Sequence, residues 1–175
     1  MFGKRTNGLP WSARVVLGPW LLPLHWSRWW WWRRDADGAA EVADGVWFGR
    51  LPDPEMIQRY GFRGVLDLTA EHDGPQASSD LTVERLPMLD LATPPSASLV
   101  AAVAAVERLR ARGPVLIHCA LGYGRSATVA AAWLLATGRE PTPEAAAVRI
   151  AGVRPGAHIP HDVLVRLPTA QPTTT

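Results

Sequence analysis

The chain has 175 residues, of which 47% are hydrophobic, a composition that is ordinary for one packed domain with a short additional segment. Its only cysteine is Cys119, so a disulfide within the chain is excluded, and its five histidines form no cluster with the spacing of metal ligands. The sequence shows no internal repeat and no nucleic-acid-binding motif, so neither a solenoid nor a nucleic-acid partner is expected.

Residues 1–34 form a basic, tryptophan-rich arm. The arm contains six of the 18 Lys and Arg residues and no acid, so its charge is +6, and the 12 basic and 16 acidic residues that follow carry −4. Seven of the nine tryptophans also lie in the arm, four of them consecutively at Trp29 to Trp32. Trp and Arg favour the boundary between lipid headgroups and acyl chains. We therefore expect an interfacial membrane anchor; the alternative is that the arm packs on the domain or contacts a partner.

The arm is a poor candidate for a membrane-spanning helix or a signal peptide. Its longest apolar stretch runs from Val15 to Leu24 and is interrupted by one glycine and two prolines, whereas a span needs about 20 apolar residues. The tryptophan run and Arg33 follow this stretch, where a signal peptide would have small residues for cleavage. We therefore expect residues 1–34 to lie on a membrane surface.

After the arm, strands and helices are predicted to alternate. Residues 35–44 are polar and contain alanine, and they are expected to connect the arm to a domain that spans residues 45–167. Pro54 and Gly61 have the positions of a helix start and a helix stop, which predicts a short helix between the first two strands. Apolar and β-branched runs predict these strands at residues 46–50, 64–69 and 82–88.

A long helix and a buried strand are predicted next. Ser96 or Ser98 can cap a helix over about residues 98–111. Apolar residues recur along one side of this helix: Leu99, Val100, Val103, Val106 and Leu109. After a Gly-Pro break, Val115 to Ile117 has the β-branched character of a central strand.

The last third of the chain is predicted to be mainly helical. An alanine-rich helix begins at Ser126 and stops at Gly138, and Thr142 caps another helix over residues 143–151. Arg154 follows, and we expect it to be an exposed turn residue; the alternative is that it packs against a carboxylate near the loop that begins at Cys119. The remaining segments are a last helix up to residue 167 and a flexible tail over residues 168–175.

Residues Cys119 to Arg125 link the central strand to the alanine-rich helix. Gly122 and Gly124 permit backbone angles that turn successive N–H groups inward, and such a nest at a helix N-terminus binds an oxyanion. The same positive field favours the thiolate form of Cys119. Arg125 supplies a planar fork of donors that matches two phosphate oxygens. The alternative, a buried cysteine in an ordinary turn, would leave the glycines and the arginine unexplained together.

The run from His118 to Ser126 has the form His-Cys-x-x-Gly-x-x-Arg-Ser. It resembles the signature of the cysteine-dependent protein tyrosine phosphatase superfamily, and most closely that of its dual-specificity branch. The resemblance implies an α/β domain of three layers, in which helices flank a central mixed sheet. It also implies that the loop follows the middle strand at its carboxyl end, where open α/β sheets place their ligands.

The resemblance also implies a role for each residue of this loop. Cys119 would attack phosphorus and form a phosphocysteine, and Arg125 would bind the substrate and stabilise the transition state. Ser126 would donate a hydrogen bond to the departing thiolate, and His118 would support the loop without acting as a base. Backbone N–H groups would hold the phosphate oxygens along the phosphate-binding loop, which comprises Cys119, Ala120, Leu121, Gly122, Tyr123, Gly124 and Arg125. This chemistry needs no cofactor and no metal.

The family's mechanism further needs an acid on a separate upstream loop, and Asp90 is our choice. It stands where a strand gives way to a proline-rich loop, 29 residues before Cys119; the alternative is that it only caps a turn. Asp67 is the next candidate, but its apolar neighbours predict a core strand and a structural role. The other acidic residues nearby occupy polar stretches and are expected to be solvated: Glu71, Asp73, Asp80 and Glu84.

The composition of the loop bears on the substrate. No basic residue stands between Cys119 and Arg125, whereas phosphoinositide phosphatases of the superfamily usually place basic residues there. A singly phosphorylated protein is therefore the expected substrate. A phospholipid is the alternative, because residues 45–52 resemble lipid-directed relatives, the phosphatidylglycerophosphate phosphatases, and an anchor would bring a lipid within reach.

Two other classes of protein remain open. A phosphate-binding pseudophosphatase would retain Cys119 and Arg125 but lack a working acid. An arsenate-reducing or sulfur-transfer enzyme could also use a thiolate in an anion-binding loop, but arsenate reduction generally recruits further cysteines, and this chain has none. A lone catalytic thiol favours a reducing compartment, so we expect the protein in the cytoplasm or on the cytoplasmic side of a membrane.

Overall fold

The computed structural model describes residues 35, 37–90 and 92–164. The predicted anchor at 1–34 and the predicted tail at 168–175 lie outside these residues. Five strands form one sheet: β1 (Ala39–Ala43), β2 (Val46–Gly49), β3 (Gly64–Asp67), β4 (Thr82–Arg85) and β5 (Val115–His118). Their order is β1-β2-β5-β3-β4, with β1 and β2 antiparallel and the other neighbours parallel. β5 is therefore the middle strand of a mixed sheet, as expected.

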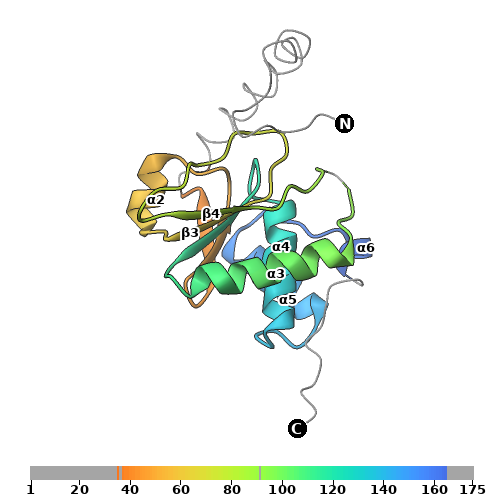
Figure 1. The fold of residues 1–175 in the computed structure, drawn as a ribbon. Helices are drawn as coiled ribbons and strands as arrows, with labels where there is room; N and C mark the ends of the chain where they lie inside the picture. The colour runs from red at the N-terminus through yellow and green to blue at the C-terminus, as the bar shows by residue number, and fades with distance from the viewer. Residues whose placement is uncertain (1–34, 36, 91, 165–175) are drawn as a thin grey trace, which may run out of the picture.

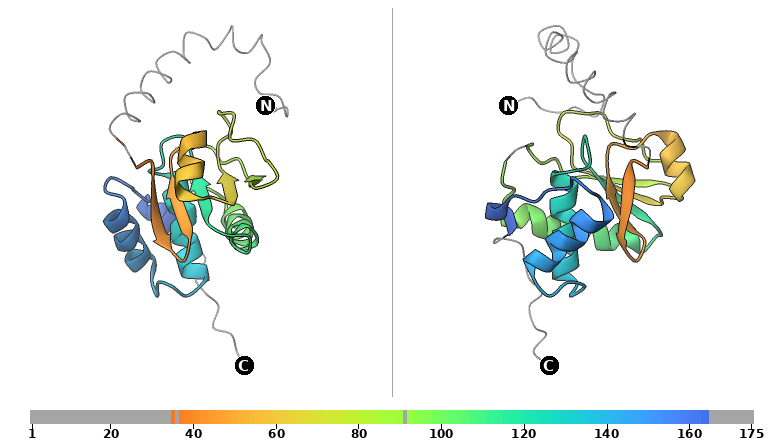
Figure 2. Two further views of the ribbon diagram at one scale, coloured as in Figure 1. Left: turned by 90° about the vertical axis from the view of Figure 1, so that its left-hand side faces the viewer. Right: turned by 180° about the vertical axis from the view of Figure 1, so that it is seen from behind.

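Helices cover both faces of the sheet. They are α2 (Pro54–Tyr60), α3 (Ser96–Arg110), α4 (Arg125–Ala136), α5 (Pro143–Val153) and α6 (His161–Leu164). In Figure 1, α2 lies on one side of the strands and α3, α4 and α5 lie on the other, and the two views in Figure 2 agree. The predicted three-layer α/β architecture is confirmed.

Strand β5 is apolar on both of its sides, so both faces of the sheet must be covered by helices. Val115 and Ile117 belong to the larger core cluster with residues of α3 and α4, whereas Leu116 packs in a second cluster with Met56 of α2. Alternate residues of a strand point to opposite faces, so a continuous apolar strand is fully buried only between two layers.

Helix α4 is the centre of the larger core. Every residue from Arg125 to Leu135 is buried, because the sheet, α3 and α5 surround the helix. A helix that is apolar on all sides requires such a position. The Trp133 indole N–H donates to Glu107 Oε1 on α3 at 2.7 Å, which satisfies its polar group. Gly138, with φ of 69°, follows the helix and confirms the predicted glycine stop.

The connector predicted at 35–44 is wrong over Ala39–Ala43, which forms strand β1. This strand pairs with β2, with Ala39 opposite Gly49, and it buries Ala39 and Val42. Alanine has a weak preference for strands, so pairing with β2 decides the conformation here more than the local sequence does.

Two predictions about α3 are also wrong. The helix begins directly after Pro95, and neither Ser96 nor another side chain caps it. Val100 is exposed, whereas Ala102 and Ala105 are fully buried in the larger core. Small side chains allow helix and sheet to approach closely, so the buried face follows the packing and not the size of the apolar residues.

Leu134→Ala should lower the free energy of unfolding by about 2–5 kcal/mol, because it leaves a cavity at a fully buried position of α4. Chemical denaturation followed by tryptophan fluorescence measures the change. Val148→Ala is the control: Val148 on α5 is 73% exposed, and its truncation should change stability by less than about 0.5 kcal/mol. Equal effects of the two substitutions would contradict the central position of α4.

Candidate active site

Three strands end side by side at one edge of the sheet. His118 is the last residue of β5, and its register neighbours are Gly49 of β2 and Asp67 of β3. The Cys119 N–H donates to the Gly49 carbonyl at 3.3 Å, so pairing continues one residue beyond the strand. Cys119 therefore stands at the carboxyl edge of the sheet, where the loop to α4 begins.

The loop turns its carbonyl groups outward. Four successive carbonyls, those of Ala120 to Tyr123, accept hydrogen bonds of 2.9–3.5 Å from residues outside the loop. The donors are the backbone N–H groups of Leu51 and His158 and the guanidinium of Arg154. In a trans peptide the carbonyl and the following N–H point in opposite directions, so the N–H groups of Leu121 to Gly124 point into the loop. This is the arrangement predicted for an anion-binding nest.

Gly122 is required for this shape. Its φ is 82°, and a Cβ at this position would lie 2.3 Å from the Gly49 carbonyl carbon. Its N–H donates to the Cys119 sulfur at 3.2 Å. Gly124, in contrast, has φ of −112°, and a Cβ there would meet no atom within 4 Å. Of the two glycines, only Gly122 therefore has a conformation and surroundings that exclude a side chain.

The sulfur of Cys119 faces donors on two sides. Cys119 is only 4% exposed, and the Gly122 N–H approaches the sulfur from the loop. The Ser126 hydroxyl oxygen, in the first turn of α4, lies 3.5 Å from the sulfur and can donate to a thiolate. The relation predicted between Ser126 and Cys119 thus has the required proximity.

Arg125 is 8% exposed, and a carboxylate binds the end of its guanidinium. Glu71 Oε2 accepts from Nη1 at 3.1 Å, and Glu71 Oε1 accepts from Nη2 at 2.5 Å. The Met88 carbonyl accepts a further hydrogen bond from Nη1 at 3.1 Å. Glu71 is exposed to solvent as predicted, but it is not merely a solvated charge, because both of its oxygens bind Arg125. The fold places the segment after β3 against α4, although 54 residues separate the two partners in the chain.

Glu71 and Arg125 shift each other's pKa toward the charged form. Burial raises the pKa of Glu71, but hydrogen bonds and the charge of Arg125, together with backbone N–H groups, outweigh burial and hold the pKa below its ordinary value. Burial lowers the pKa of Arg125, but the hydrogen bond to Glu71, together with electrostatic interactions with Cys119, Glu71 and Asp90, raises it above its ordinary value. Both groups are therefore charged at neutral pH, and the buried guanidinium can bind an anion.

One edge of Arg125 remains for a ligand. Its Nε atom is buried and donates no hydrogen bond to any residue that the structure describes, and Nη2 has a second hydrogen on that same edge. Asp90 Oδ1 forms an ion pair with Nε at 3.3 Å, but the Asp90 side chain is 63% exposed, so a phosphate can replace it on this edge. Asp90 therefore stands at the opening of the site, beside the edge that can bind two phosphate oxygens.

A cleft of about 410 Å³ adjoins this edge. Asp90, Tyr123 and Arg125 form part of its wall. The rest of the lining is mainly apolar and includes Met88, Leu89, Pro94, Pro160 and Val163. Among the described residues that line the cleft, Arg125 is the only lysine or arginine. The cleft can therefore hold the apolar part of a molecule whose anionic group binds the loop.

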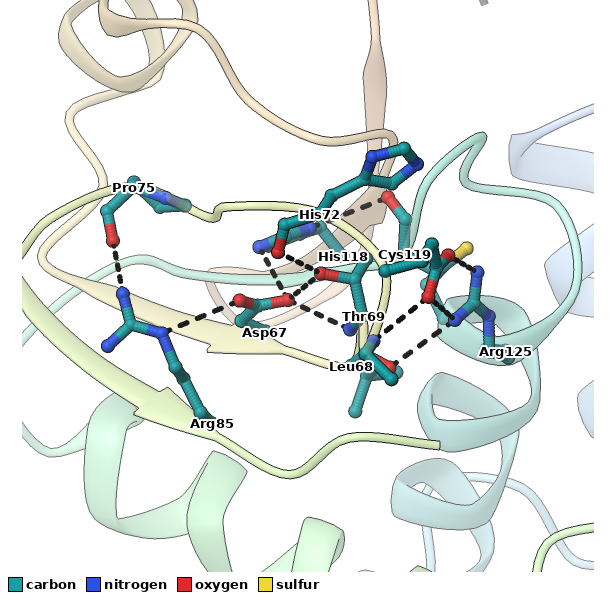
Figure 3. A network of polar contacts seen from close by, with 12 residues as sticks. Asp67, Leu68, Thr69, His72, Pro75, Arg85, His118, Cys119 and Arg125 are labelled. Atoms are coloured by element: carbon teal, nitrogen blue, oxygen red, sulfur yellow. Dashed lines mark hydrogen bonds and ion pairs between the residues drawn. The ribbon is translucent and has the colours of Figure 1, made fainter. Parts of the chain in front are cut away.

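A buried polar network supports His118 (Figure 3). Asp67 Oδ1 accepts hydrogen bonds from the Thr69 N–H and hydroxyl at 2.8 and 2.6 Å. His118 Nε2 lies 3.6 Å from this oxygen, and Arg85 Nε lies 3.7 Å from the other carboxylate oxygen. Figure 3 shows Asp67 between Arg85 on one side and the residues beside Cys119 on the other. Asp67 thus has the structural position expected of it, because it ties β3 to the residue before Cys119.

Residues 46–156 match the family described as dual specificity phosphatase, catalytic domain. The chain belongs to the dual-specificity phosphatase family. PTPMT1 is 26% identical, with a TM-score of 0.62 over 74% of this chain and 90% of that chain. Human DUSP28 is 25% identical, with a TM-score of 0.64 over 74% and 90%. Tk-PTP in the active form is 27% identical, with a TM-score of 0.63 over 74% and 92%.

The family inferred from the loop signature is thereby confirmed, and the chain is a cysteine-dependent phosphatase that hydrolyses phosphate monoesters. The fold of this dual-specificity phosphatase brings Cys119, Ser126, Arg125 and Asp90 to one site, while their individual chemical roles stay predictions. Sequence reasoning missed Glu71, because a carboxylate in a polar stretch gives no local sign of its partner. Of the other acids expected to be solvated, Asp73 and Asp80 are exposed, and Glu84 pairs with Arg108 on the surface.

The described residues contain neither a metal-binding group of side chains nor a membrane-spanning helix. No three side chains of the His, Cys, Asp or Glu type are grouped there so that they could hold a metal ion. In the same part of the phosphatase, no helix has the length and apolar character needed to cross a membrane.

Glu71→Gln should lower kcat/KM for phenyl phosphate by about tenfold, because a neutral amide orients the Arg125 fork less firmly than a partly exposed carboxylate does. Steady-state kinetics measures the change. Glu84→Gln is the matched control, since Glu84 makes the same two-oxygen contact with Arg108 on the surface, and it should leave the kinetics unchanged. A rise in kcat/KM for the Glu71 variant would show instead that Glu71 competes with the substrate.

Proposed function

We propose that this phosphatase acts on singly phosphorylated proteins, with phosphotyrosine as the first candidate, through a phosphocysteine intermediate. The proposal rests on the convergence of the Cys119 sulfur, the Nε edge of Arg125 and the Asp90 carboxylate 3.3 Å from that edge. Together they offer a nucleophile, an anion clamp and a proton donor. These are the groups that transfer of a phosphoryl group to sulfur requires.

The first step transfers the phosphoryl group to the enzyme. Nε and Nη2 of Arg125 bind two phosphate oxygens, and the inward N–H groups of the loop bind the oxygens as well. The Cys119 sulfur forms a bond to phosphorus while the bond from phosphorus to the leaving oxygen breaks. Protonated Asp90 gives its proton to that oxygen, so the product departs as a neutral alcohol or phenol.

The second step regenerates the thiolate. Water attacks the phosphorus of phosphocysteine, and the Asp90 carboxylate takes the proton that the water loses. The bond between sulfur and phosphorus breaks, and inorganic phosphate is released. Ser126, 3.5 Å from the sulfur, donates a hydrogen bond to the thiolate as it departs.

The charges near the site favour a single phosphate. Asp90 and Asp162 line the cleft, and Glu71 binds Arg125, so a second phosphate would meet carboxylates where it needs cations. The mainly apolar wall suits an aromatic leaving group, which gains from burial and from ring contacts. Phosphotyrosine combines one phosphate with one aromatic ring.

A phospholipid is the second candidate substrate. It is supported by PTPMT1, which was crystallised in complex with PI(5)P and matches this chain with 26% identity and a TM-score of 0.64. The apolar cleft can also receive part of a lipid. The absence of lysine and arginine between Cys119 and Arg125 places this candidate second.

We further propose that residues 1–34 hold the phosphatase on the cytoplasmic surface of a membrane. Six basic residues attract anionic lipids, and seven tryptophans favour the interface. The single thiol of the chain supports a reducing compartment. An anchor of this kind would concentrate the enzyme near substrates at the membrane.

Asp90→Asn should lower kcat for phenyl phosphate by about 10²–10⁴-fold without weakening inhibition by inorganic phosphate, because the proton donor is lost while Arg125 and the loop stay in place. Cys119→Ser, which removes the nucleophile, should have no turnover. Full turnover by the Asp90 variant would exclude its role as the acid. The same assay on tyrosine-, serine- and threonine-phosphorylated peptides and on vesicles with phosphatidylglycerophosphate ranks the substrates, and preference for the vesicles would select the lipid candidate.

Replacement of Trp29 to Trp32 by serine should reduce sedimentation with vesicles that contain anionic phospholipid by about tenfold or more, because the indole rings provide most of the apolar contact with the interface. Turnover of soluble phenyl phosphate should stay at the wild-type level and serves as the folding control. Sedimentation equal to that of the wild type would rule out the anchor.

A further inference from the structure

Arg154 supports the phosphate-binding loop from outside. It follows α5 and is only 5% exposed, so the prediction of an exposed turn residue is wrong. Its Nε donates to the Gly122 carbonyl at 3.0 Å, and its Nη2 donates to the Leu121 carbonyl at 3.5 Å. The guanidinium also lies over the Tyr123 ring, 4.6 Å from the ring centroid. One side chain thus contacts three successive residues of the loop.

Asp35 binds the same guanidinium from the other side. Nη1 of Arg154 donates to Asp35 Oδ1 at 3.3 Å, and Nη2 donates to Asp35 Oδ2. The Asp35 carboxylate also accepts a hydrogen bond from the Gly38 N–H at 3.3 Å, just before β1. A carboxylate that binds through both oxygens fixes the plane of a guanidinium as well as balancing its charge. Asp35 therefore determines the direction in which Nε of Arg154 points.

The two peptide groups that Arg154 binds lie next to the Cys119 sulfur. The Leu121 carbonyl and the Gly122 N–H belong to one peptide plane, and this N–H donates to the Cys119 sulfur at 3.2 Å. The Gly122 carbonyl and the Tyr123 N–H belong to the next plane, whose N–H points into the loop. Rotation of either plane would remove an N–H donor from a bound anion. Arg154 holds both planes by their carbonyl ends.

We propose that Asp35 is a positioning residue for phosphate binding: it orients Arg154, which keeps the Leu121 and Gly122 peptides turned with their N–H groups toward the phosphate. The inference rests on the proposed phosphate-binding role of this loop. Asp35 directly follows the basic arm at 1–34, so the first residue of the segment expected to be a mere connector contributes to the site.

Asp35→Asn in the full-length protein tests this role. The amide oxygen can still accept from the Gly38 N–H, but the charged contact with Arg154 is lost. Binding of inorganic phosphate should weaken, and KM for phenyl phosphate should rise, by about threefold to tenfold, the range that corresponds to the net loss of one ordinary hydrogen bond. The effect on kcat should be smaller than the effect on KM. Asp35→Glu restores the carboxylate and should bring both values to within about twofold of the wild type.

A second pair of an aspartate and an arginine provides the control. Asp44 Oδ2 accepts hydrogen bonds of 2.9 and 2.7 Å from Arg139, and that guanidinium, like that of Arg154, lies over an aromatic ring, 4.4 Å from the centroid of Trp133. This pair lies at the far end of α4, away from the loop, so Asp44→Asn should leave phosphate binding and KM unchanged. In an Arg154→Lys background, Asp35→Asn should add little further loss, because both act through one contact.

Equal phosphate affinity and equal KM for Asp35→Asn and Asp44→Asn would overturn the proposal. Titration calorimetry with inorganic phosphate requires no turnover, so it separates this inference from the proposed reaction. If turnover proves independent of Cys119 while Asp35→Asn still weakens phosphate binding, the proposed reaction fails and the positioning role stands. If turnover depends on Cys119 but Asp35→Asn leaves phosphate binding unchanged, only the positioning role fails.

Discussion

The peptide planes of the loop between β5 and α4 are the constraint on which the site depends. A trans peptide cannot turn its carbonyl and the following N–H to the same side, so an inward row of N–H groups requires an outward row of carbonyls with partners. Leu51 after β2, Arg154 after α5 and His158 before α6 supply those partners. Segments from distant parts of the chain therefore meet around one loop, and the whole fold contributes to the shape that receives a phosphate.

The buried charge of Arg125 imposes a second constraint. A guanidinium taken out of water needs compensation, and Glu71 supplies it through two hydrogen bonds at the end of the group. This arrangement leaves the Nε edge directed toward Asp90 and the cleft. Glu71 thus stabilises the arginine without covering the edge that a phosphate can use, which explains how a charged side chain stays both buried and available.

Choice of substrate involves two separate parts of the chain. In the proposed function, the cleft beside Arg125 receives the group that carries the phosphate, and the arm at 1–34 brings the enzyme to the membrane. One fold supports many activities, so the match with PTPMT1, which was crystallised with PI(5)P, does not by itself select a substrate for this chain. The neutral loop and the acidic side chains at the cleft are the features of this chain that favour one phosphate over several.

The sequence alone determined the family, the order of most elements and the place of the loop between a strand and a helix, because the spacing from Cys119 to Ser126 and the helix signals at Pro54, Gly61 and Gly138 are local patterns. Only the tertiary structure decided that Ala39–Ala43 is a strand, that Glu71 binds Arg125 and that Asp35 binds Arg154. The last two pairs join residues 54 and 119 positions apart. A short polar stretch has the same local pattern whether its carboxylate is solvated or bound, and the partner is chosen by how distant elements pack.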